Sequence, residues 1–509
     1  MTSKPSKILT LERLAEFIAA QKAKGRRVVH CHGCFDLLHI GHIRHFKSAR
    51  ELGDVLVVTV TPDRFVNKGP DRPAFPEELR LEAIAALDMV DAVALNRWPT
   101  AVETIGLIKP DLYAKGMEYK NAANDVTGGI RLEQDAVEAV GGALAFTDDI
   151  VFSSSSLINR FASAYPKEVK EYLEGFARRH PAAAINQQLG RASDLSVLVV
   201  GEAIIDDYEY CEAIGKSSKE PTLAVKSLYS KRFAGGILAV ANHVASFAGK
   251  VTLLTQVGDR DDHLEFIRGH VRGDIDAHYL KRRNSPTIVK KRLIEHYFFT
   301  KMLEVYSIND AALEPDDESA FCAELERLAP KHDVVLVADF GHSLMTPRAV
   351  QTLCKHARYL AVNTQANAGN MGYNVISKYP RADYISLAEK EMRLEARDYR
   401  GDLTPMITRL AEKLNCPRIT VTRGSNGSMV YDRTTGLSHV PALAQKVVDR
   451  VGAGDASLSV CALMAAQGAP AEMMAFVGNV AGAWAVSIVG NEKSIDRVNL
   501  AKQIETLLK

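Results

Sequence analysis

The stretch "RRVVHCHGCFDLLHIGHIRHFKSARELGDVLVVTVT" (residues 26–61) decides the fold of the first part of the chain. Residues 26–33 read as a strand, residues 41–52 follow a helical pattern, and residues 53–61 form the near-continuous apolar run of a buried parallel strand. A strand, a helix and a parallel strand with short connections are the repeating unit of an α/β fold. We therefore expect a parallel sheet that carries helices on both faces.

The same alternation continues on both sides of this stretch. A helix capped by Thr10 precedes it, and helices alternate with strands as far as residue 116. A chain of 509 residues is too long for one ordinary domain, and a fresh strand at residues 195–208 starts a second series. We predict two doubly wound α/β domains, over residues 1–165 (Rossmann-like) and 193–509, joined by a helical linker over residues 166–192.

The composition is that of a globular protein, with 47% hydrophobic and 25% charged residues. A net charge of +1 without long Lys/Arg runs argues against a nucleic-acid or anionic-membrane partner. The seven scattered cysteines fit reduced thiols, and the N-terminal residues lack a signal peptide. The apolar residues 458–490 are interrupted by Pro470, Glu472 and Asn479, so we expect two buried helices rather than a membrane span, and a cytoplasmic protein.

A candidate phosphate site lies in "HIGH" (residues 39–42), where the first strand gives way to a helix. Orphan N–H groups and the positive end of the helix dipole favour an anion at such a junction. His39 and His42 share one helical face, and Gly33 and Gly41 allow a phosphate to approach the backbone. A zinc site is disfavoured because zinc helices usually present His at i and i+4. We expect the neighbouring His30 and His45 to be core residues instead.

These residues resemble the HxGH nucleotidyltransferases, in particular their cytidylyltransferase-like branch, over about residues 26–160. The resemblance implies that a phosphate on the substrate attacks the α-phosphate of a nucleoside triphosphate and that pyrophosphate leaves. His39 and His42 would then be the catalytic residues that stabilise charge on the phosphates. The resemblance assigns nucleotide binding to Gly33, Phe35, Asp36, Gly41, Arg44, Lys47, Arg80, Lys115, Gly116, Ser153, Ser154 and Ser155. Lys47 could equally be a solvated helix residue, and Asp36 a structural residue of the turn.

A second phosphate-type turn, "DRVGAGDASLS" (residues 449–459), precedes an apolar helix near the C-terminus. Together with "GEAIIDDY", "RFAGGILAVANHVAS" and "VTRGSNGSMVYD", it resembles the ribokinase-like (PfkB) sugar kinases over about residues 195–500. The resemblance makes Asp455 the general base; a helix cap is the alternative. It assigns the sugar to Asp206, Gly235, Gly236, Asn242, Lys290 and Arg292, and the anion hole and ATP to Gly452, Ala453, Gly454, Glu389, Thr422, Gly424, Gly427 and Asn479.

One departure from that family concerns magnesium. The magnesium-associated NxxE pattern is "SLAE" (residues 386–389) here, so Glu389 is kept as an indirect Mg²⁺ residue without its Asn. The pattern "VNTQ" (residues 362–365) likewise replaces a more usual "VDPK" and leaves the role of Asn363 open. We expect Mg²⁺, with ATP as phosphoryl donor.

A kinase joined to a nucleotidyltransferase resembles the bifunctional heptose-7-phosphate kinase/heptose-1-phosphate adenylyltransferases of ADP-heptose and lipopolysaccharide synthesis, with the domain order reversed. The resemblance implies sugar-phosphate substrates, ATP or CTP as nucleotidyl donor, and a homodimer through a small β lid formed by residues 220–233 and 285–305. Two alternatives stay open. One is a CTP-dependent cytidylyltransferase for a small polyol phosphate such as glycerol 3-phosphate, fused to a kinase of another sugar. The other is a degenerate sugar-binding regulator.

Overall fold

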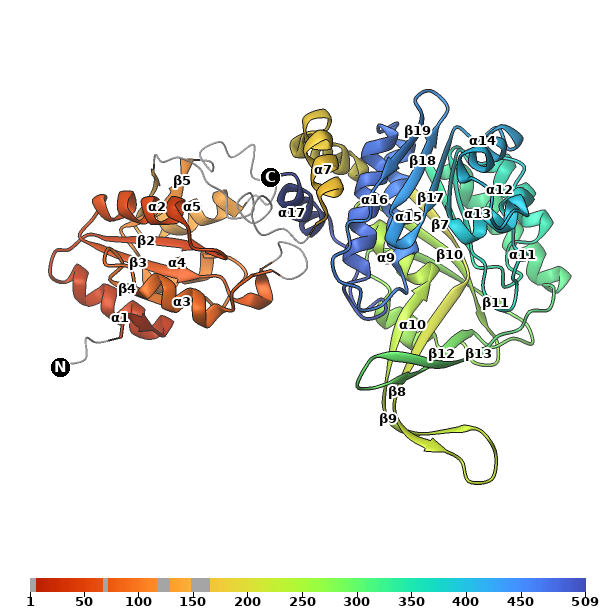
Figure 1. The fold of residues 1–509 in the computed structure, drawn as a ribbon, viewed down its shortest axis with the longest axis horizontal. Coiled ribbons are helices and arrows are strands. Elements are labelled where there is room, and N and C mark those ends of the chain that lie inside the picture. The colour runs from red at the N-terminus through yellow and green to blue at the C-terminus, as the bar shows by residue number, and fades with distance from the viewer. Residues whose placement is uncertain (1–5, 67–71, 118–128, 148–164) are drawn as a thin grey trace. The chain divides into compact units, whose positions relative to one another are not determined.

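The computed structural model describes residues 6–66, 72–117, 129–147 and 165–509. The chain divides into two compact units, each with its own sheet (Figure 1). The first unit comprises residues 1–166 with residues 181–183 and 501–509, and the second comprises residues 167–180 and 184–500.

The first unit is built on a six-stranded parallel sheet of order β1-β4-β3-β2-β5-β6. Its strands are β1 (Ile8–Leu9), β2 (Val28–Gly33), β3 (Val55–Val60), β4 (Ala92–Leu95), β5 (Leu112–Gly116) and β6 (Ala143–Thr147). Its helices are α1 (Leu11–Lys22), α2 (Ile40–Glu51), α3 (Glu77–Ala85), α4 (Val102–Ile108) and α5 (Gly129–Ala139). Thr10 caps α1 as expected, because its hydroxyl accepts the Arg13 N–H.

Helices cover both faces of this sheet, so the doubly wound prediction is confirmed. Phe46 of α2 and Ile84 of α3 pack against β3 in one buried cluster. Leu14 of α1 and Ile108 of α4 pack against residues of β2 and β3 in another. Successive side chains of a strand point to opposite faces of the sheet, so the near-continuous apolar strands contribute residues to both clusters.

The second unit is built on a nine-stranded sheet of order β11-β10-β7-β14-β15-β16-β17-β18-β19. The strands are β7 (Ser196–Gly201), β10 (Lys250–Gly258), β11 (Asp276–Arg282), β14 (Val334–Asp339), β15 (Leu360–Thr364), β16 (Tyr384–Ala388), β17 (Arg418–Thr422), β18 (Ser428–Asp432) and β19 (Gly436–Val440). The strands from β11 to β17 are parallel, and β18 and β19 add antiparallel pairs at one edge.

Two layers of helices enclose this sheet (Figure 1). One layer contains α11 (Pro315–Leu328), α12 (Pro347–His356), α13 (Glu389–Ala396) and α14 (Leu403–Lys413), whose apolar residues form one buried cluster with the strands. The other contains α9 (Ile237–Ala245), α15 (Ala453–Ala466) and α16 (Ala471–Ala485), in which α15 contacts both α9 and α16. α10 (Leu264–His270) follows β10, and α17 (Arg497–Leu507) ends the chain. The two buried helices predicted near residues 458–490 are thus α15 and α16, and no described helix is long and apolar enough to cross a membrane.

The sequence at residues 195–208 was predicted as one strand, and the structure divides it. Glu202 separates β7 of the large sheet from β8 (Ala203–Lys216), which belongs to a four-stranded sheet of order β13-β12-β8-β9. That sheet, called the lid below, also contains β9 (Leu223–Gly236), β12 (Ile288–Glu295) and β13 (Thr300–Ser307), in the segments where lid strands were expected. The long β8–β9 hairpin projects from the body of the unit (Figure 1).

Helices also occupy the expected linker segment. They are α7 (Lys167–Arg179) and α8 (Ala182–Gly190). Phe176 of α7 stacks on Phe476 of α16 at 4.1 Å between ring centroids, and Arg179 pairs with Glu472 at 2.7 Å. Helix α7 is therefore packed onto the second unit rather than being a free spacer.

Candidate active sites

The first site lies where the strand order of the six-stranded sheet reverses. The connection after β2 runs to β3 on one side, and the connection after β5 runs to β6 on the other, so a crevice opens between the carboxyl ends of β2 and β5. Helix α2 begins at that edge, and His39 is its N-cap. His39 Nδ1 accepts the Gly41 N–H at 3.0 Å, so the fitting tautomer carries its proton on Nε2, where it can donate to an anion.

The structure brings the two predicted catalytic histidines together. The rings of His39 and His42 stack with centroids 4.0 Å apart. The ring of His42 is nearly perpendicular to that of Phe35, with centroids 5.3 Å apart. Phe35 has a positive φ of 49°, a strained conformation that lies beside this pair. Two imidazoles at a helix N-terminus form a compact group of donors for a phosphate.

The other histidines of the segment make structural hydrogen bonds. Buried His30 Nε2 lies 2.7 Å from Thr59 Oγ1, and His45 Nδ1 lies 2.7 Å from Thr147 Oγ1. Burial lowers the pKa of His30 to about 3, so that ring is neutral. The core role expected for His30 is confirmed, and His45 is tied to the end of β6.

Arg80 is buried and its guanidinium is shared among four partners. It donates to the Phe75 carbonyl at 3.0 Å, to the Thr61 carbonyl at 2.9 Å and to the Cys34 carbonyl, and it pairs with Asp63 at 2.6 Å. The structure therefore shows Arg80 holding the loops that follow β2 and β3. Its assignment to the nucleotide remains a prediction.

The remaining residues assigned to the nucleotide lie in different environments. Asp36 is buried and accepts hydrogen bonds from Arg72 at 2.9 Å and from the Ala74 N–H, the structural role considered from the sequence. Lys115 pairs with Glu133 at 2.9 Å, and Lys47 is exposed on α2. Gly33, Gly41 and Arg44 lie at the end of β2 and the start of α2, and Gly116 ends β5. Ser153, Ser154 and Ser155 lie outside the described residues.

The second site is a cleft of about 290 Å³ at the carboxyl edge of the nine-stranded sheet, under the lid. It is lined by Ile204, Asp206, Gly236, Lys290, Arg292, Phe340, Asn363, Gln365, Ser386, Leu387, Ala388, Glu391, Thr422, Arg450, Val451, Gly452, Gly454, Asp455 and Asn491. Eight of these residues were predicted from the sequence, and they come from the lid, from a strand end, from the turn before α15 and from the first turn of α15.

Asp455 is a buried carboxylate in the first turn of α15. The N-cap is Gly452, so Asp455 does not cap the helix, and the alternative considered from the sequence is wrong. Its Oδ1 accepts a hydrogen bond from Gln365 Nε2 at 2.8 Å. Burial raises the pKa of Asp455 to about 7; the Gln365 hydrogen bond opposes this, and nearby Asp206 adds to it. A carboxylate with a pKa near the working pH suits a general base.

The backbone before Asp455 requires glycine. Gly452 has a φ of +84°, and a Cβ there would lie 2.3 Å from Asn491 Oδ1. Only glycine adopts this conformation without strain, and Gly452 and Gly454, at the start of α15, both line the cleft. The turn is thus shaped as an anion-binding site at a helix N-terminus.

The lid supplies the charged groups of the opposite wall. Asp206 and Arg292 form a buried ion pair, and Arg292 Nε also binds Glu304 at 2.9 Å. Gly235 admits Asp206, because a Cβ on Gly235 would lie 2.1 Å from Asp206 Oδ2. Lys290 is buried beside them, and burial lowers its pKa. Glu304, Gln365 and Arg450 were not among the predicted residues; "VNTQ" was the signal for Gln365, since it departs from the family pattern.

Seven of the residues predicted for this site are outside the residues that line the cleft: Gly235, Asn242, Glu389, Gly424, Gly427, Ala453 and Asn479. Asn242 bonds the His270 carbonyl at 2.8 Å and the Arg272 N–H at 3.0 Å, so it joins α9 to the end of α10. Asn479 donates to the carbonyls of Val440, which ends β19, and of Pro441. Gly424 and Gly427 form the turn between β17 and β18.

Glu389 also faces away from the cleft. It binds Arg393 at 2.8 Å and Arg423 at 3.2 Å. The carboxylate that lines the cleft is Glu391, which accepts the Ala366 and Ala388 N–H groups. Burial raises the pKa of Glu391 to about 7. The structure thus presents Glu391, rather than Glu389, to the cleft.

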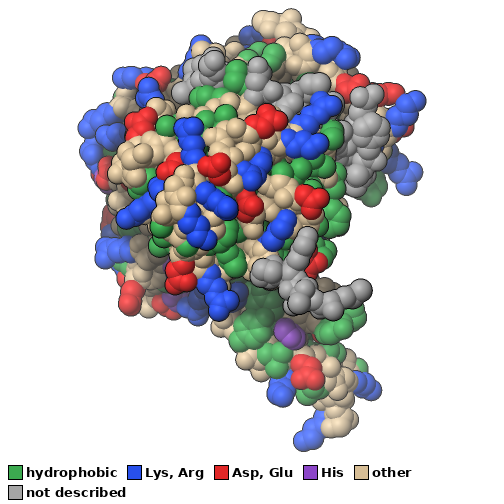
Figure 2. All heavy atoms as spheres, turned by 90° about the vertical axis from the view of Figure 1, so that its left-hand side faces the viewer, with side chains coloured by type: hydrophobic (Ala, Val, Ile, Leu, Met, Phe, Trp, Pro, Cys, Tyr) green, Lys and Arg blue, Asp and Glu red, His purple; other side chains and the backbone are tan. Residues whose placement is uncertain are grey.

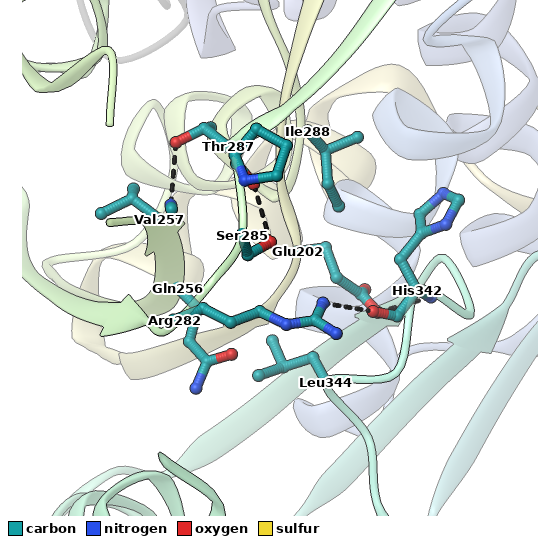
Figure 3. A pocket seen from close by; sticks show the side chains of 11 residues that line it. Glu202, Gln256, Val257, Arg282, Ser285, Thr287, Ile288, His342 and Leu344 are labelled. Atoms are coloured by element: carbon teal, nitrogen blue, oxygen red, sulfur yellow. Dashed lines mark hydrogen bonds between the residues drawn. The ribbon is translucent and has the colours of Figure 1, made fainter. Parts of the chain in front are cut away.

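A smaller hollow lies along the same sheet edge, at the ends of β7, β10 and β11 (Figure 3). It has about 20 Å³ of space, enough for about one water molecule. Glu202 accepts the Phe340 and His342 N–H groups at 3.0 Å each, and Arg282 donates to the His342 carbonyl at 3.2 Å. These hydrogen bonds fix the loop from which Phe340 reaches the main cleft.

Comparison with known proteins divides the chain in the same way. The model of the pfkB family carbohydrate kinases matches residues 194–497, and the cytidylyltransferase-like model matches residues 30–161. The N-terminal part is similar to the bifunctional protein HldE of Trichlorobacter lovleyi, with 40% identity over 168 residues. It is also similar to that of Geobacter sulfurreducens, with 36% identity over 168 residues. Each alignment covers 32% of this chain and 32% of the relative, so the match spans about a third of the length of these curated relatives.

Solved structures support the fold of the second unit. Phosphofructokinase-2 from Escherichia coli, solved in complex with potassium, is 14% identical with a TM-score of 0.50, over 62% of this chain and 100% of that chain. At this identity the likeness concerns the fold alone.

We predict that His39→Ala lowers pyrophosphate release at the first site by on the order of 10²-fold, because one preorganised donor to the phosphates is lost. Pyrophosphate release is measured with the full chain, a nucleoside triphosphate and a sugar phosphate as the acceptor. Glu51→Ala, an exposed change at the far end of α2, is the matched control and should leave the rate unchanged. An unchanged rate in His39→Ala would contradict the role of this histidine.

We predict that the rate of ADP formation at the second site falls as the pH drops below about 7, because Asp455 must be deprotonated to accept a proton. Asp455→Asn should lower this rate by about 10²- to 10⁴-fold and remove the pH dependence. Pyrophosphate release by the same preparation should persist, since the acceptor expected at the first site is already a phosphate and needs no base. If both activities fell together, the two sites would not be independent.

Proposed function

The chain belongs to the pfkB family of carbohydrate kinases, and from this we propose that its second unit phosphorylates a sugar phosphate with ATP while its first unit transfers a nucleotidyl group to a sugar phosphate. The observation that carries the kinase proposal is one cleft that combines the buried base Asp455, the glycine turn before α15 and the basic residues Lys290 and Arg292. The cytidylyltransferase-like match and the paired histidines His39 and His42 carry the second activity.

In the kinase reaction, a sugar hydroxyl attacks the γ-phosphorus of ATP, its proton passes to Asp455, and ADP leaves. Gln365 holds Oδ1 of Asp455, which leaves Oδ2 to face the hydroxyl. The N–H groups at Gly452, Ala453 and Gly454 would stabilise the charge on the transferring group. Thr422, at the end of β17, lines the side of the cleft proposed for ATP.

A magnesium ion fits the residues on that side of the cleft. Asn363 is buried, and its Oδ1 has no hydrogen-bond partner among the described residues. Glu391 lines the same cleft, and carboxylate and amide oxygens are ligands that Mg²⁺ prefers. Bound there with ATP, the ion would neutralise phosphate charge. Asn363 and Glu391 would hold it directly or through water, whereas Glu389 is engaged with two arginines.

The lid favours a substrate that already carries a phosphate. Lys290 is buried, and no carboxylate among the described residues lies within ion-pair distance of it. A buried ammonium without a counter-ion is costly, so an anionic group of the substrate would compensate it. We therefore propose a sugar phosphate, with heptose 7-phosphate preferred because the N-terminal part is similar to bifunctional HldE proteins.

In the transferase reaction, a phosphate oxygen of the substrate attacks the α-phosphorus of the nucleotide, and pyrophosphate leaves. His39 donates from Nε2 while its Nδ1 holds the start of α2. His42, stacked on it, would stabilise charge on the same phosphates. Lys115 and Gly116 at the end of β5 would lie beside the nucleotide, as would Ser153, Ser154 and Ser155. We propose ATP as the nucleotidyl donor, which would make the product an ADP-sugar of the kind used in lipopolysaccharide synthesis.

The test is to incubate the full chain with each nucleoside triphosphate and a panel of sugar phosphates, and to follow ADP and pyrophosphate separately. We expect ADP from ATP with heptose 7-phosphate, and pyrophosphate from ATP with heptose 1-phosphate. Asp455→Asn and His39→Ala are the controls that assign each product to its site. Pyrophosphate from CTP with glycerol 3-phosphate would favour the polyol alternative, and no turnover of any nucleotide would favour a sugar-binding regulator.

We also propose that the chain forms a homodimer through the outer face of the lid. Along β13, Glu304 faces the cleft, so Leu303 and Val305 point to the opposite face. They are 57% and 50% exposed, and hydrophobic side chains are visible on the projecting lid (Figure 2). Exposed apolar side chains on an edge strand such as β13 are stabilised when a second layer covers them.

We predict that the full chain is a dimer in light scattering at micromolar concentration, and that Leu303→Glu with Val305→Glu makes it a monomer. Charges buried in an apolar interface oppose association. Leu132→Glu, on α5 of the first unit and 56% exposed, is the matched control and should leave the dimer intact. A monomeric unaltered chain would exclude this proposal.

A further inference from the structure

Asp449, which starts the turn before α15, is a buried carboxylate held by four donors. Its Oδ2 accepts from Tyr208 Oη at 2.6 Å and from the Gly490 N–H at 2.9 Å. Its Oδ1 accepts from the Val451 N–H at 3.1 Å and from Lys301 Nζ. Both oxygens are thus fully engaged, and the direction of this side chain is fixed.

The four donors belong to three different parts of the unit. Tyr208 lies on β8 and Lys301 on β13, so both come from the lid. Val451 belongs to the turn itself, and Gly490 lies in the loop after α16. A single carboxylate therefore joins the lid to the turn that precedes Asp455.

The charge on Lys301 is the decisive part of this junction. Burial alone would raise the pKa of Asp449, but the hydrogen bonds from Lys301 and Tyr208 lower it, so the carboxylate is ionised. Among the described residues, Lys301 is the one cation within ion-pair distance of this carboxylate. Tyr208 contributes a neutral hydroxyl, since burial raises its pKa. Without Lys301, Asp449 would be an uncompensated buried charge.

The position of Asp449 affects the turn directly. The Cβ that Gly452 lacks would lie 2.3 Å from Asn491 Oδ1, so the turn packs closely against the loop whose Gly490 N–H binds Asp449. Val451, Gly452 and Asn491 line the cleft, whereas Lys301 does not. A shift of Asp449 would therefore be transmitted to the turn residues that line the cleft, although Lys301 lies outside that lining.

We propose that Lys301 is a positioning residue for phosphoryl transfer, which ties the lid to the anion-binding turn through Asp449. The proposal rests on the kinase function proposed above. Lys290 and Arg292 of the same lid line the side of the cleft proposed for the sugar, so Asp449 connects that side to the turn proposed to bind phosphate. When the lid is in place, the turn is held in the position that phosphoryl transfer requires.

The first test is Lys301→Ala in the full chain. We expect kcat for ADP formation to fall by on the order of 10-fold to 10²-fold, the cost of misplacing transfer groups, while KM for the sugar phosphate changes little. The matched control is Lys231→Ala, because Lys231 lies on β9 of the same lid and its pair with Glu492, at 3.8 Å, is half exposed. Lys231→Ala should retain the kcat of the unaltered chain.

The second test distinguishes positioning from a general loss of structure. Ammonium chloride should restore part of kcat in Lys301→Ala, because a small cation can replace the lost ammonium beside Asp449. Sodium chloride at equal ionic strength controls for screening. The double variant Lys301→Ala with Asp449→Asn removes both charges and should not respond to ammonium.

Two outcomes would overturn the proposal: an unchanged kcat in Lys301→Ala, or a reduced kcat that ammonium does not restore. Pyrophosphate release by the first unit, measured on the same preparations, shows that each chain is folded and active there. ADP formation by the unaltered chain tests the proposed kinase function separately, since the role of Lys301 is read from the ratio of variant to unaltered rates.

Discussion

Burial of carboxylates at the carboxyl edge of the nine-stranded sheet is the constraint on which the second unit depends. A carboxylate removed from water must find donors or take up a proton. Asp449 is paired with a cation and keeps a low pKa, whereas Asp455 and Glu391 have neutral donors and their pKa values rise to about 7. The same burial thus produces an anchoring charge in one place and a group able to exchange a proton in another.

Two further buried carboxylates extend this network behind the cleft. Asp339, at the end of β14, accepts the Tyr379 hydroxyl at 2.8 Å and pairs with Lys378. Glu202, at the point where the chain leaves the large sheet for the lid, binds two N–H groups of the loop after β14. Burial and the neighbouring charge of Asp339 raise the pKa of Glu202. The loop that contributes Phe340 to the cleft therefore also holds Glu202, the residue at which the chain passes from the large sheet to the lid.

The two units place their candidate sites at the same position of an α/β fold but build them from different residues. In each, a helix begins at the carboxyl edge of a parallel sheet, where its first N–H groups can face an anion. His39 caps α2 through Nδ1, so the capping residue itself presents a donor. Gly452 caps α15 with a left-handed backbone and no side chain, and the reactive carboxylate follows within the first turn. The first arrangement suits a reaction between phosphates, and the second suits one in which a hydroxyl must lose a proton.

The sequence by itself determined the two α/β series, the turns at residues 39–42 and 449–455, and the pair of buried helices near the C-terminus. These features depend on apolar periodicity and on glycine or capping residues within a short stretch, so local sequence specifies them. Only the tertiary structure decided which side chains face the cleft. Glu389 and Glu391 are two residues apart on α13, about 200° around the helix, and the surrounding Arg393 and Arg423 draw Glu389 away. The division of residues 195–208 at Glu202 likewise depends on strands and loops far along the chain, since pairing partners and buried charges come from contacts that no local pattern contains.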